Sequence, residues 1–469
     1  MRAARAALDH ARSHAEWHQA ALDHDELTGA AAWRQDDESP HYDADALRDS
    51  LTAMADLRRQ GDGHGLIQRL TEDLYRNLGD LGAPELFDTA LGGTKDLVEA
   101  YLDEAERSLF WLADTPLDGV SVAEKRTRFR TARKVFGRSA LLLSGGATWG
   151  FHHLGVVKAL FEAGLLPHVL SGASTGAMVA AGVCARDNAE LAEMFADTDQ
   201  IRLDGLVPRG LGRALEAGSW LDPEGLYEVL RHNVGDVTFA EAFGHSGRAL
   251  NISVSPTRKS QKPRLLCWLT APNLLVARAA LASSALPLLF PAVELVARSH
   301  DGRVVPYIPG ERWVDGSLHG DLPKLRLSRL HNVNHFIVSQ TNPHVLPFVA
   351  HRGRRGVRPT LAGLTSTTLR TQGVWAAELA RKAAGGGAVG QLADHAHALV
   401  SQDYRGDIDI HPRFDPRLLA KVMSNPTRDD LAKFIREGAR SVWPQLARIH
   451  AQTRISRGFQ SCLDRLGPV

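Results

Sequence analysis

The stretch HVLSGASTGAMVAAG, residues 168–182, reads as a short apolar strand, a tight turn and an alanine-rich helix. Its centre has the Gly-x-Ser-x-Gly spacing of a nucleophile elbow, in which a serine occupies a strained turn between a strand and a helix. Gly172 and Gly176 would let the strand and the helix pack closely around Ser174. The helix N-terminus would favour negative charge that develops above the serine. Glycine, alanine and serine are also ordinary strand-to-helix residues, so this motif alone makes Ser174 a candidate.

The overall composition indicates an ordinary globular protein. The chain has 469 residues, of which 44% are hydrophobic and 23% charged, which is enough for two or three domains and a large core. A formal net charge of +1 argues against bulk electrostatic binding of nucleic acid. The three cysteines Cys184, Cys267 and Cys462 are widely spaced, which predicts neither a disulfide framework nor a zinc site and indicates a reducing compartment.

Neither a targeting segment nor a membrane span is predicted. The N-terminal MRAARAALDHARSH lacks the apolar core of a signal peptide. The most apolar stretch, residues 274–297, contains Arg278, Pro287, Pro291 and Glu294, and these residues argue against a transmembrane helix. We therefore expect a cytoplasmic protein that can still contact membranes peripherally.

The chain divides into three predicted regions. Residues 1–137 have helical periodicity throughout and form an N-terminal helical domain. Residues 138–345 alternate apolar strands with amphipathic helices, which predicts an α/β domain whose mostly parallel sheet is covered on both faces. Residues 346–469 read as a basic, Pro/Gly-rich linker and a helical region that packs on the catalytic domain. In that region Thr427 and Asp430 resemble a capping box.

A second glycine-rich turn, SGGATWG at residues 144–150, joins a strand to a helix. Dinucleotide-binding folds place their phosphate loop at such a turn, but they carry an acidic residue near the end of the second strand. Here that strand ends in LSGAST, without a carboxylate. In a hydrolase, the N–H groups of Gly145, Gly146 and Ala147 would instead hold the oxyanion formed when Ser174 attacks an ester, each donor contributing about 3 to 4 kcal/mol at the transition state.

The residue that takes the proton of Ser174 stays open at this level. Asp315 in ERWVDGSLHGDLP follows a strand-like segment, and a carboxylate within hydrogen-bond reach of a serine can act as its base when burial raises its pKa. Asp-Gly is also a common turn. A serine, acid and histidine triad remains the alternative. The candidate histidines are His152, His153, His319, His331, His335 and His344.

With these motifs in view, the chain resembles the patatin-like phospholipase family. The family has a glycine-rich oxyanion loop, a Gly-x-Ser-x-Gly elbow and an Asp-Gly-Gly or Asp-Gly-Ala motif, matched here in order by GGATWG, GASTG and DGS. The chain is most similar to a branch of intracellular triacylglycerol lipases with an extra N-terminal helical domain. The resemblance spans roughly residues 60–450 and is carried by residues 74–102, 235–257, 269–295, 313–345 and 425–446.

The resemblance implies a patatin-like three-layer α/β fold and a serine acyl hydrolase with a Ser174–Asp315 dyad, in which Asp315 takes the proton and no histidine is required. It implies no metal and no organic cofactor. The supporting glycines would be Gly150, Gly172, Gly176 and Gly316.

Three residues depart from the family pattern. Ala147 replaces the third glycine of the oxyanion loop, Trp149 stands where many patatins carry a cation, and Ser317 follows Asp315-Gly316 in place of glycine or alanine. None of these changes removes a catalytic group, so they bear on substrate preference more than on activity.

The substrates implied are long-chain acylglycerols, with phospholipids or lysophospholipids as the alternative. A protein of a different class, a weakly active lipid-surface scaffold, would have no need for Ser174, Asp315 and the glycines together. The partners expected are therefore lipids and a lipid surface, and no nucleic acid. Two basic runs, residues 125–138 and 352–358, are the predicted contacts with anionic headgroups.

Overall fold

The fold is described from a computed structural model. It covers residues 1–74, 78–217, 219–258, 261–287, 289–343, 345, 404–413 and 422–467, without the side chains of residues 213, 215, 217, 318 and 319. Among these residues, no helix is both long enough and apolar enough to cross a membrane.

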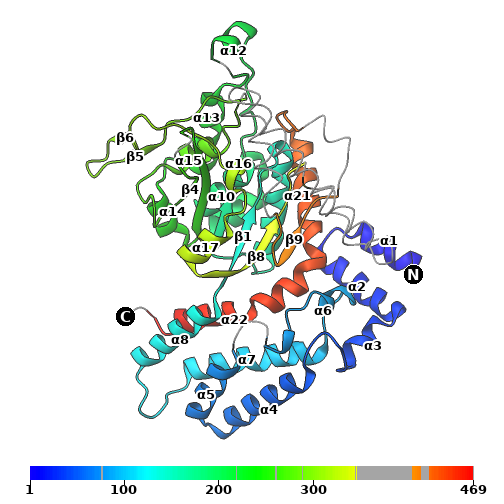
Figure 1. The fold of residues 1–469 in the computed structure, drawn as a ribbon. Coiled ribbons are helices and arrows are strands. Elements are labelled where there is room, and N and C mark those ends of the chain that lie inside the picture. Colours follow the sequence, from blue (N-terminus) through cyan, green and yellow to red (C-terminus); the bar gives the residue numbers. More distant parts are fainter. Residues whose placement is uncertain are drawn as a thin grey trace, which may run out of the picture.

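A seven-stranded sheet forms the centre of the catalytic domain (Figure 1). The strand order is β4-β3-β2-β1-β8-β9, and β7 also pairs with β3. The strands β3, β2, β1, β8 and β9 are parallel, whereas β4 and β7 run antiparallel to β3. The bounds are β1 Arg138–Leu143, β2 Val169–Gly172, β3 Ala249–Pro256, β4 Arg264–Cys267, β7 Trp313–Asp315, β8 Val333–Ser339 and β9 Ile408–Ile410.

Helices cover both faces of this sheet because alternate strand residues point to opposite sides. Leu141 and Leu143 of β1 belong to the main hydrophobic core, which includes residues of α9, α10 and α15. Ala140 and Leu142 belong to a second cluster with residues of α17. The predicted three-layer α/β fold is confirmed. The helices are α9 His152–Glu162, α10 Thr175–Cys184, α11 Asn188–Ala196, α12 Leu211–Ala217, α13 Pro223–Val234, α14 Phe239–Ser246, α15 Val276–Ser283, α16 Ser317–Gly320 and α17 Lys324–His331.

A helical layer lies below the catalytic domain in Figure 1. Its own core is formed largely by α4, α5, α7 and α8, and side chains such as Phe459 of the C-terminal helix α22 complete it. The helices are α1 Arg2–His10, α2 His14–Thr28, α3 Ala30–Gln35, α4 Ala44–Gln60, α5 Gly63–Asp73, α6 Glu85–Asp88, α7 Asp96–Asp114 and α8 Val122–Phe136, with α21 Arg428–Val442 and α22 Leu446–Arg465 near the C-terminus.

The C-terminal region was predicted to pack on the catalytic domain, and its two long helices pack on different partners. α21 packs closely on α9 of the catalytic domain, and Thr427 and Asp430 form the expected capping box at its start. α22 packs instead on α7 and α8. The reason is its apolar side, where Ile455, Phe459 and Cys462 are buried in the helical core.

Candidate active site

Ser174 lies in the turn between β2 and α10 with a backbone that non-glycine residues rarely adopt, φ 52° and ψ −127°. Such strain persists only where surrounding structure enforces it. Here the Ser174 N–H donates to the carbonyl oxygen of Ser283 at 3.2 Å and to its hydroxyl at 3.0 Å. The turn is tight because a Cβ on Gly172 would clash with the carbonyl of Gly176, and a Cβ on Gly176 would clash with that of Leu143.

Asp315 ends β7 and is only 2% exposed. Its Oδ1 accepts the N–H of Ser317 at 2.8 Å, and its own N–H donates to the carbonyl of Ala285 at 3.0 Å. Gly316 allows this turn, since a Cβ there would clash with the carbonyl of Ser253 on β3. The antiparallel pairing of β7 with β3 therefore fixes the position of the carboxylate.

The side chain of Ser174 lies close enough to Asp315 to influence the pKa of its carboxyl group, and both residues line the same pocket. Burial raises the pKa of Asp315 to about 6, while hydrogen bonds from Ser317 and Ser174 act in the opposite direction. A carboxylate with such a pKa is ionised near neutral pH and basic enough to accept a proton from a nucleophile. The two residues are thus arranged as a nucleophile and its base.

The oxyanion loop differs from the sequence prediction at Gly145. The N–H of Gly145 donates to Oδ1 of Asp321 at 2.9 Å, so it is not free to hold an oxyanion. Within the described part of the chain, the N–H groups of Gly146 and Ala147 have no hydrogen-bond partner, and both residues line the pocket beside Ser174. Ala147 adopts a left-handed φ of 47°, which explains why glycine is usual at this position.

Asp321 is the residue of this site that the sequence analysis missed. It is 1% exposed, and its Oδ2 accepts the side-chain N–H of Asn342 at 2.7 Å. Burial first, and the nearby charge of Asp315 as well, raise the pKa of Asp321 to about 7, whereas the bonds from Gly145 and Asn342 lower it. The only signal in the sequence is the second aspartate of DGSLHGD, which would have had to be placed next to a loop far away in the chain.

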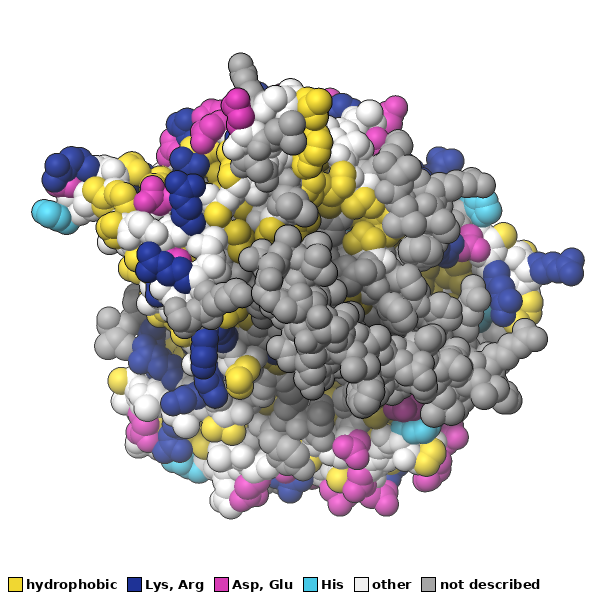
Figure 2. All heavy atoms as spheres, turned by 45° about the horizontal axis from the view of Figure 1, so that its top comes forward, with side chains coloured by type: hydrophobic (Ala, Val, Ile, Leu, Met, Phe, Trp, Pro, Cys, Tyr) yellow, Lys and Arg dark blue, Asp and Glu magenta, His cyan; other side chains and the backbone are white. Residues whose placement is uncertain are grey.

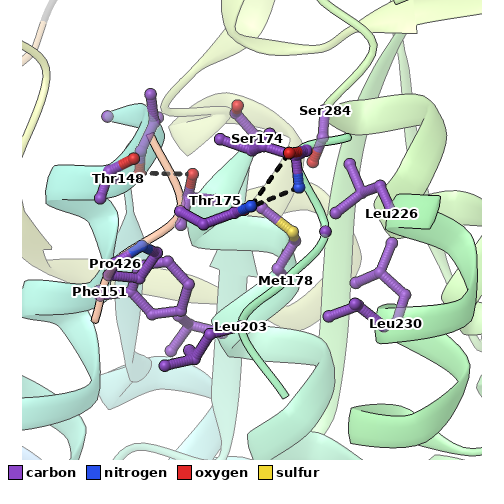
Figure 3. A pocket seen from close by; sticks show the side chains of 18 of the residues that line it. Thr148, Phe151, Ser174, Thr175, Met178, Leu203, Leu226, Leu230, Ser284 and Pro426 are labelled. Atoms are coloured by element: carbon purple, nitrogen blue, oxygen red, sulfur yellow. Dashed lines mark hydrogen bonds between the residues drawn. The ribbon is translucent and has the colours of Figure 1, made fainter. Parts of the chain in front are cut away.

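A cavity of about 330 Å³ opens beside Ser174 (Figure 3). Its walls are mostly apolar, and Figure 3 shows Phe151, Met178 and Leu203 facing Leu226 and Leu230 of α13 across it. An apolar cavity next to a polar reacting group suits an acyl chain. Further lining residues are Leu154, Val179, Val183, Met194, Ile201, Leu206, Val229, Leu286, Leu289, Phe290 and Val422.

None of the described histidine side chains reaches the Ser174–Asp315 pair. His153 is buried and bonded to Ser339 and to the carbonyl of Ser144, and burial lowers its pKa to about 4. His152 contacts Ser441, and His331 contacts Asn251. His335 bridges Ser139 and Gln452. The side chain of His319 and the whole of His344 lie outside the described residues.

One group among the described residues could hold a metal ion, and it lies outside the pocket. Asp187, Glu190 and His245 bring their ligand atoms within 4.8 Å of one another at the surface. All three already have local roles, because Asp187 and Glu190 form the capping box of α11 and His245 donates to Glu190. The group is therefore explained by the capping of α11 and by the pairing of His245 with Glu190.

The first predicted basic run lies on α8, at the opposite end of the molecule from α12 and α13 (Figure 1). Lys125 is buried and donates to the carbonyls of Leu112 and Thr115. Arg128 pairs with Glu124, and the Arg133 side chain donates to Gln460. Several of these cations thus make contacts within the helical layer. The second run, residues 352–358, lies outside the described residues.

Known protein families match both the N-terminal helical region and the α/β region of the chain. A family model described as patatin-like phospholipase matches residues 141–325, and one described as a domain of unknown function, DUF3336, matches residues 1–134. Triacylglycerol lipase SDP1L of Arabidopsis thaliana is 33% identical over 95% of this chain and 58% of its own length. Triacylglycerol lipase 4 of Saccharomyces cerevisiae is 34% identical over 93% of this chain and 50% of its own length.

The chain thus spans about half the length of some of its relatives. It spans nearly all of another, triacylglycerol lipase ptl3 of Schizosaccharomyces pombe, which is 32% identical over 94% of this chain and 92% of its own length. With the similarity extending over both proteins almost from end to end, the chain belongs to the patatin-like phospholipase family.

Proposed function

We propose that this protein is a serine acyl hydrolase that cleaves long-chain acylglycerols, with triacylglycerols as the preferred class. The observation that carries the proposal is the pairing of Ser174 with the buried carboxyl group of Asp315 beside an apolar cavity of about 330 Å³. The names of the relatives as triacylglycerol lipases support the substrate class.

In the proposed mechanism the Ser174 oxygen attacks the ester carbonyl while Asp315 accepts the hydroxyl proton. The carbonyl oxygen becomes negative and is held by the N–H groups of Gly146 and Ala147. The intermediate then releases the alcohol, which takes the proton from Asp315, and leaves an acyl group on Ser174. Asp315 next activates a water molecule that hydrolyses this acyl-enzyme and regenerates the serine. No step requires a metal ion or an organic cofactor.

Asp321 is proposed as a positioning residue for the oxyanion loop. Its carboxyl binds the N–H of Gly145 at 2.9 Å, while the Gly145 carbonyl accepts hydroxyl hydrogen bonds from Ser144 at 2.7 Å and Thr341 at 3.0 Å. Gly145 is thus held through both its N–H and its carbonyl group, and we propose that this keeps the next two N–H groups along the chain, those of Gly146 and Ala147, available for the oxyanion. Asp321 touches no reacting atom in this scheme and acts through the loop.

We expect Asp321→Ala to lower kcat on a soluble ester by roughly 10- to 100-fold with little change in KM, because a loosened oxyanion donor weakens binding of the transition state only. Asp321→Asn should recover most of this loss, since the amide oxygen can accept from Gly145 and Asn342 can turn its own amide to match. Steady-state kinetics of both variants provide the measurement. Equal losses in the two variants, or a change confined to KM, would contradict the positioning role.

Phospholipid hydrolysis is the second candidate function, because the family model that matches residues 141–325 is described as patatin-like phospholipase. The proposal is tested by fatty-acid release from emulsified trioleoylglycerol, from phosphatidylcholine vesicles and from lysophosphatidylcholine. We expect the highest rate on the triacylglycerol, and Ser174→Ala provides the blank. A higher rate on either phospholipid would assign the protein to the alternative, and no release from any of the three would favour the scaffold.

Acylglycerols form a phase separate from water, so the proposed activity requires contact with a lipid surface. We propose that this contact is peripheral, at a membrane or a lipid droplet.

A further inference from the structure

A short segment leaves the body of the molecule next to α13 and carries α12 at its tip (Figure 1). Its two arms are hydrogen-bonded to each other, since the Arg209 N–H donates to the carbonyl of Trp220 at 2.9 Å and the Asp222 N–H donates to that of Val207 at 2.9 Å. We call residues 207–217, 219 and 220 the α12 projection. The two arms of its stem are therefore paired through their backbones.

The α12 projection exposes large apolar side chains to solvent. Val207 is 42% exposed, Leu211 66% and Trp220 53%. Single exposed apolar residues are ordinary on protein surfaces, whereas several in one projecting segment beside a pocket indicate a contact site. Figure 2 shows hydrophobic side chains in yellow across the upper part of the face that contains α12 and α13.

Both arms of the α12 projection begin at the wall of the catalytic pocket. Leu203 and Leu206 line the pocket immediately before the first arm. At the end of the second arm, the N–H of Leu221 donates to the carbonyl of Leu289, another lining residue, at 2.9 Å. A surface that touches the projection is thus adjacent to the edge of the pocket.

The projection has three charged residues, Arg209, Arg213 and Glu216, and the structure describes the side chains of Arg209 and Glu216. Arg209 is occupied, because it pairs with Asp222 at 3.4 Å and donates to the hydroxyl of Ser219 at 2.9 Å. Glu216 is exposed. Tryptophan is enriched at membrane–water boundaries, where its ring is partly in the apolar layer and its N–H reaches water.

We propose that the α12 projection anchors this protein on a lipid surface, with Val207, Leu211 and Trp220 inserted at the boundary of the acyl layer. The proposal rests on the acyl hydrolase function proposed above and identifies the surface through which substrate reaches the pocket. Because the contact is apolar, its strength follows buried area and depends little on salt. A contact through the basic runs would instead weaken at high salt.

The experiment compares the wild type with a Val207→Ser, Leu211→Ser, Trp220→Ser triple variant. The matched control is Val304→Ser, Val305→Ser, on the β5–β6 hairpin (Val296–Arg298 and Val304–Pro306), which also projects from the body (Figure 1) and exposes these valines by 58% and 37%. Each protein is floated with trioleoylglycerol droplets coated with phosphatidylcholine, in low salt and in ~1 M salt. Hydrolysis is measured on the same droplets and on a water-soluble butyrate ester.

We expect wild type and control to float equally well in both salt conditions. For the triple variant, the bound fraction and the rate of hydrolysis on droplets should each fall about tenfold, because less apolar area is inserted. Its rate on the soluble ester should stay unchanged. Flotation of the triple variant at the wild-type level, or release of the wild type by salt, would overturn the proposal. If the wild type floats and the triple variant does not, but no oleate is released, the anchor stands and the acylglycerol substrate fails.

Discussion

Ser174→Ala is expected to abolish ester hydrolysis, with a loss of at least ~10⁴-fold in kcat, because removal of a nucleophile eliminates the covalent route and leaves only the oxyanion donors and binding. The variant should fold normally, since alanine fits the space and the Ser174 N–H keeps its bonds to Ser283. A fluorophosphonate probe provides a second measurement. It should label the wild type at one site and leave Ser174→Ala unlabelled.

Ser284→Ala is the matched control for the labelling experiment. Ser284 also lines the pocket, but its hydroxyl donates to the carbonyl of Ala280 at 2.9 Å and has no carboxylate partner among the described residues. The probe should therefore still label this variant. Persistent labelling of Ser174→Ala, or loss of labelling in Ser284→Ala alone, would place the nucleophile outside the elbow.

Asp315→Asn is the prediction with the second-largest effect. The amide has nearly the same shape but cannot accept the proton of Ser174, so kcat should fall by about 10³- to 10⁴-fold. In the wild type, kcat/KM on a soluble ester should fall tenfold per pH unit below about pH 6, because burial raises the pKa of Asp315 to about 6 and the base works only when ionised. The residual kcat/KM of Asp315→Asn should not show this decrease below pH 6.

The same substitution should stabilise the fold. A carboxyl group whose pKa is raised on folding stabilises the native state below its unfolded pKa, and this contribution is lost as the pH rises through the folded pKa. For Asp315 the pKa rises from 3.8 to about 6 on folding. The free energy of unfolding at neutral pH is therefore lower by about 3 kcal/mol than in acid, at 1.36 kcal/mol per pH unit. Asp315→Asn should thus increase Tm at pH 8 and lose this advantage near pH 4.

Asp409→Asn is the control for both effects. Asp409 of β9 also has a pKa raised by burial, and its Oδ1 accepts the N–H of Gly406 at 2.8 Å, but it does not line the pocket. Its replacement should affect stability and leave the rate and its pH limb unchanged. A histidine variant as inactive as Asp315→Asn, with an intact fold, would restore the triad mechanism.

Most elements of the fold followed from local sequence. Alternating apolar strands and amphipathic helices predicted the three-layer α/β domain, because the period of side-chain burial differs between strands and helices. The elbow was also local, since its strand, turn, helix and close-packing glycines all lie within residues 168–182. Asp315 became the expected base only through the family resemblance. From the residues alone, a histidine fitted equally well.

The tertiary structure decided which groups meet around Ser174 and which of them are free. Sheet order and the antiparallel pairing of β7 with β3 bring Asp315 to the elbow and leave the described histidine side chains elsewhere. Asp321 occupies the N–H of Gly145, which leaves Gly146 and Ala147 as the proposed oxyanion donors among the three residues expected from the sequence. The apolar side of α22 packs in the helical layer, whereas Val207, Leu211 and Trp220 of the α12 projection remain exposed. Local periodicity specifies an element and its buried face, but its partner depends on contacts between residues distant in the chain.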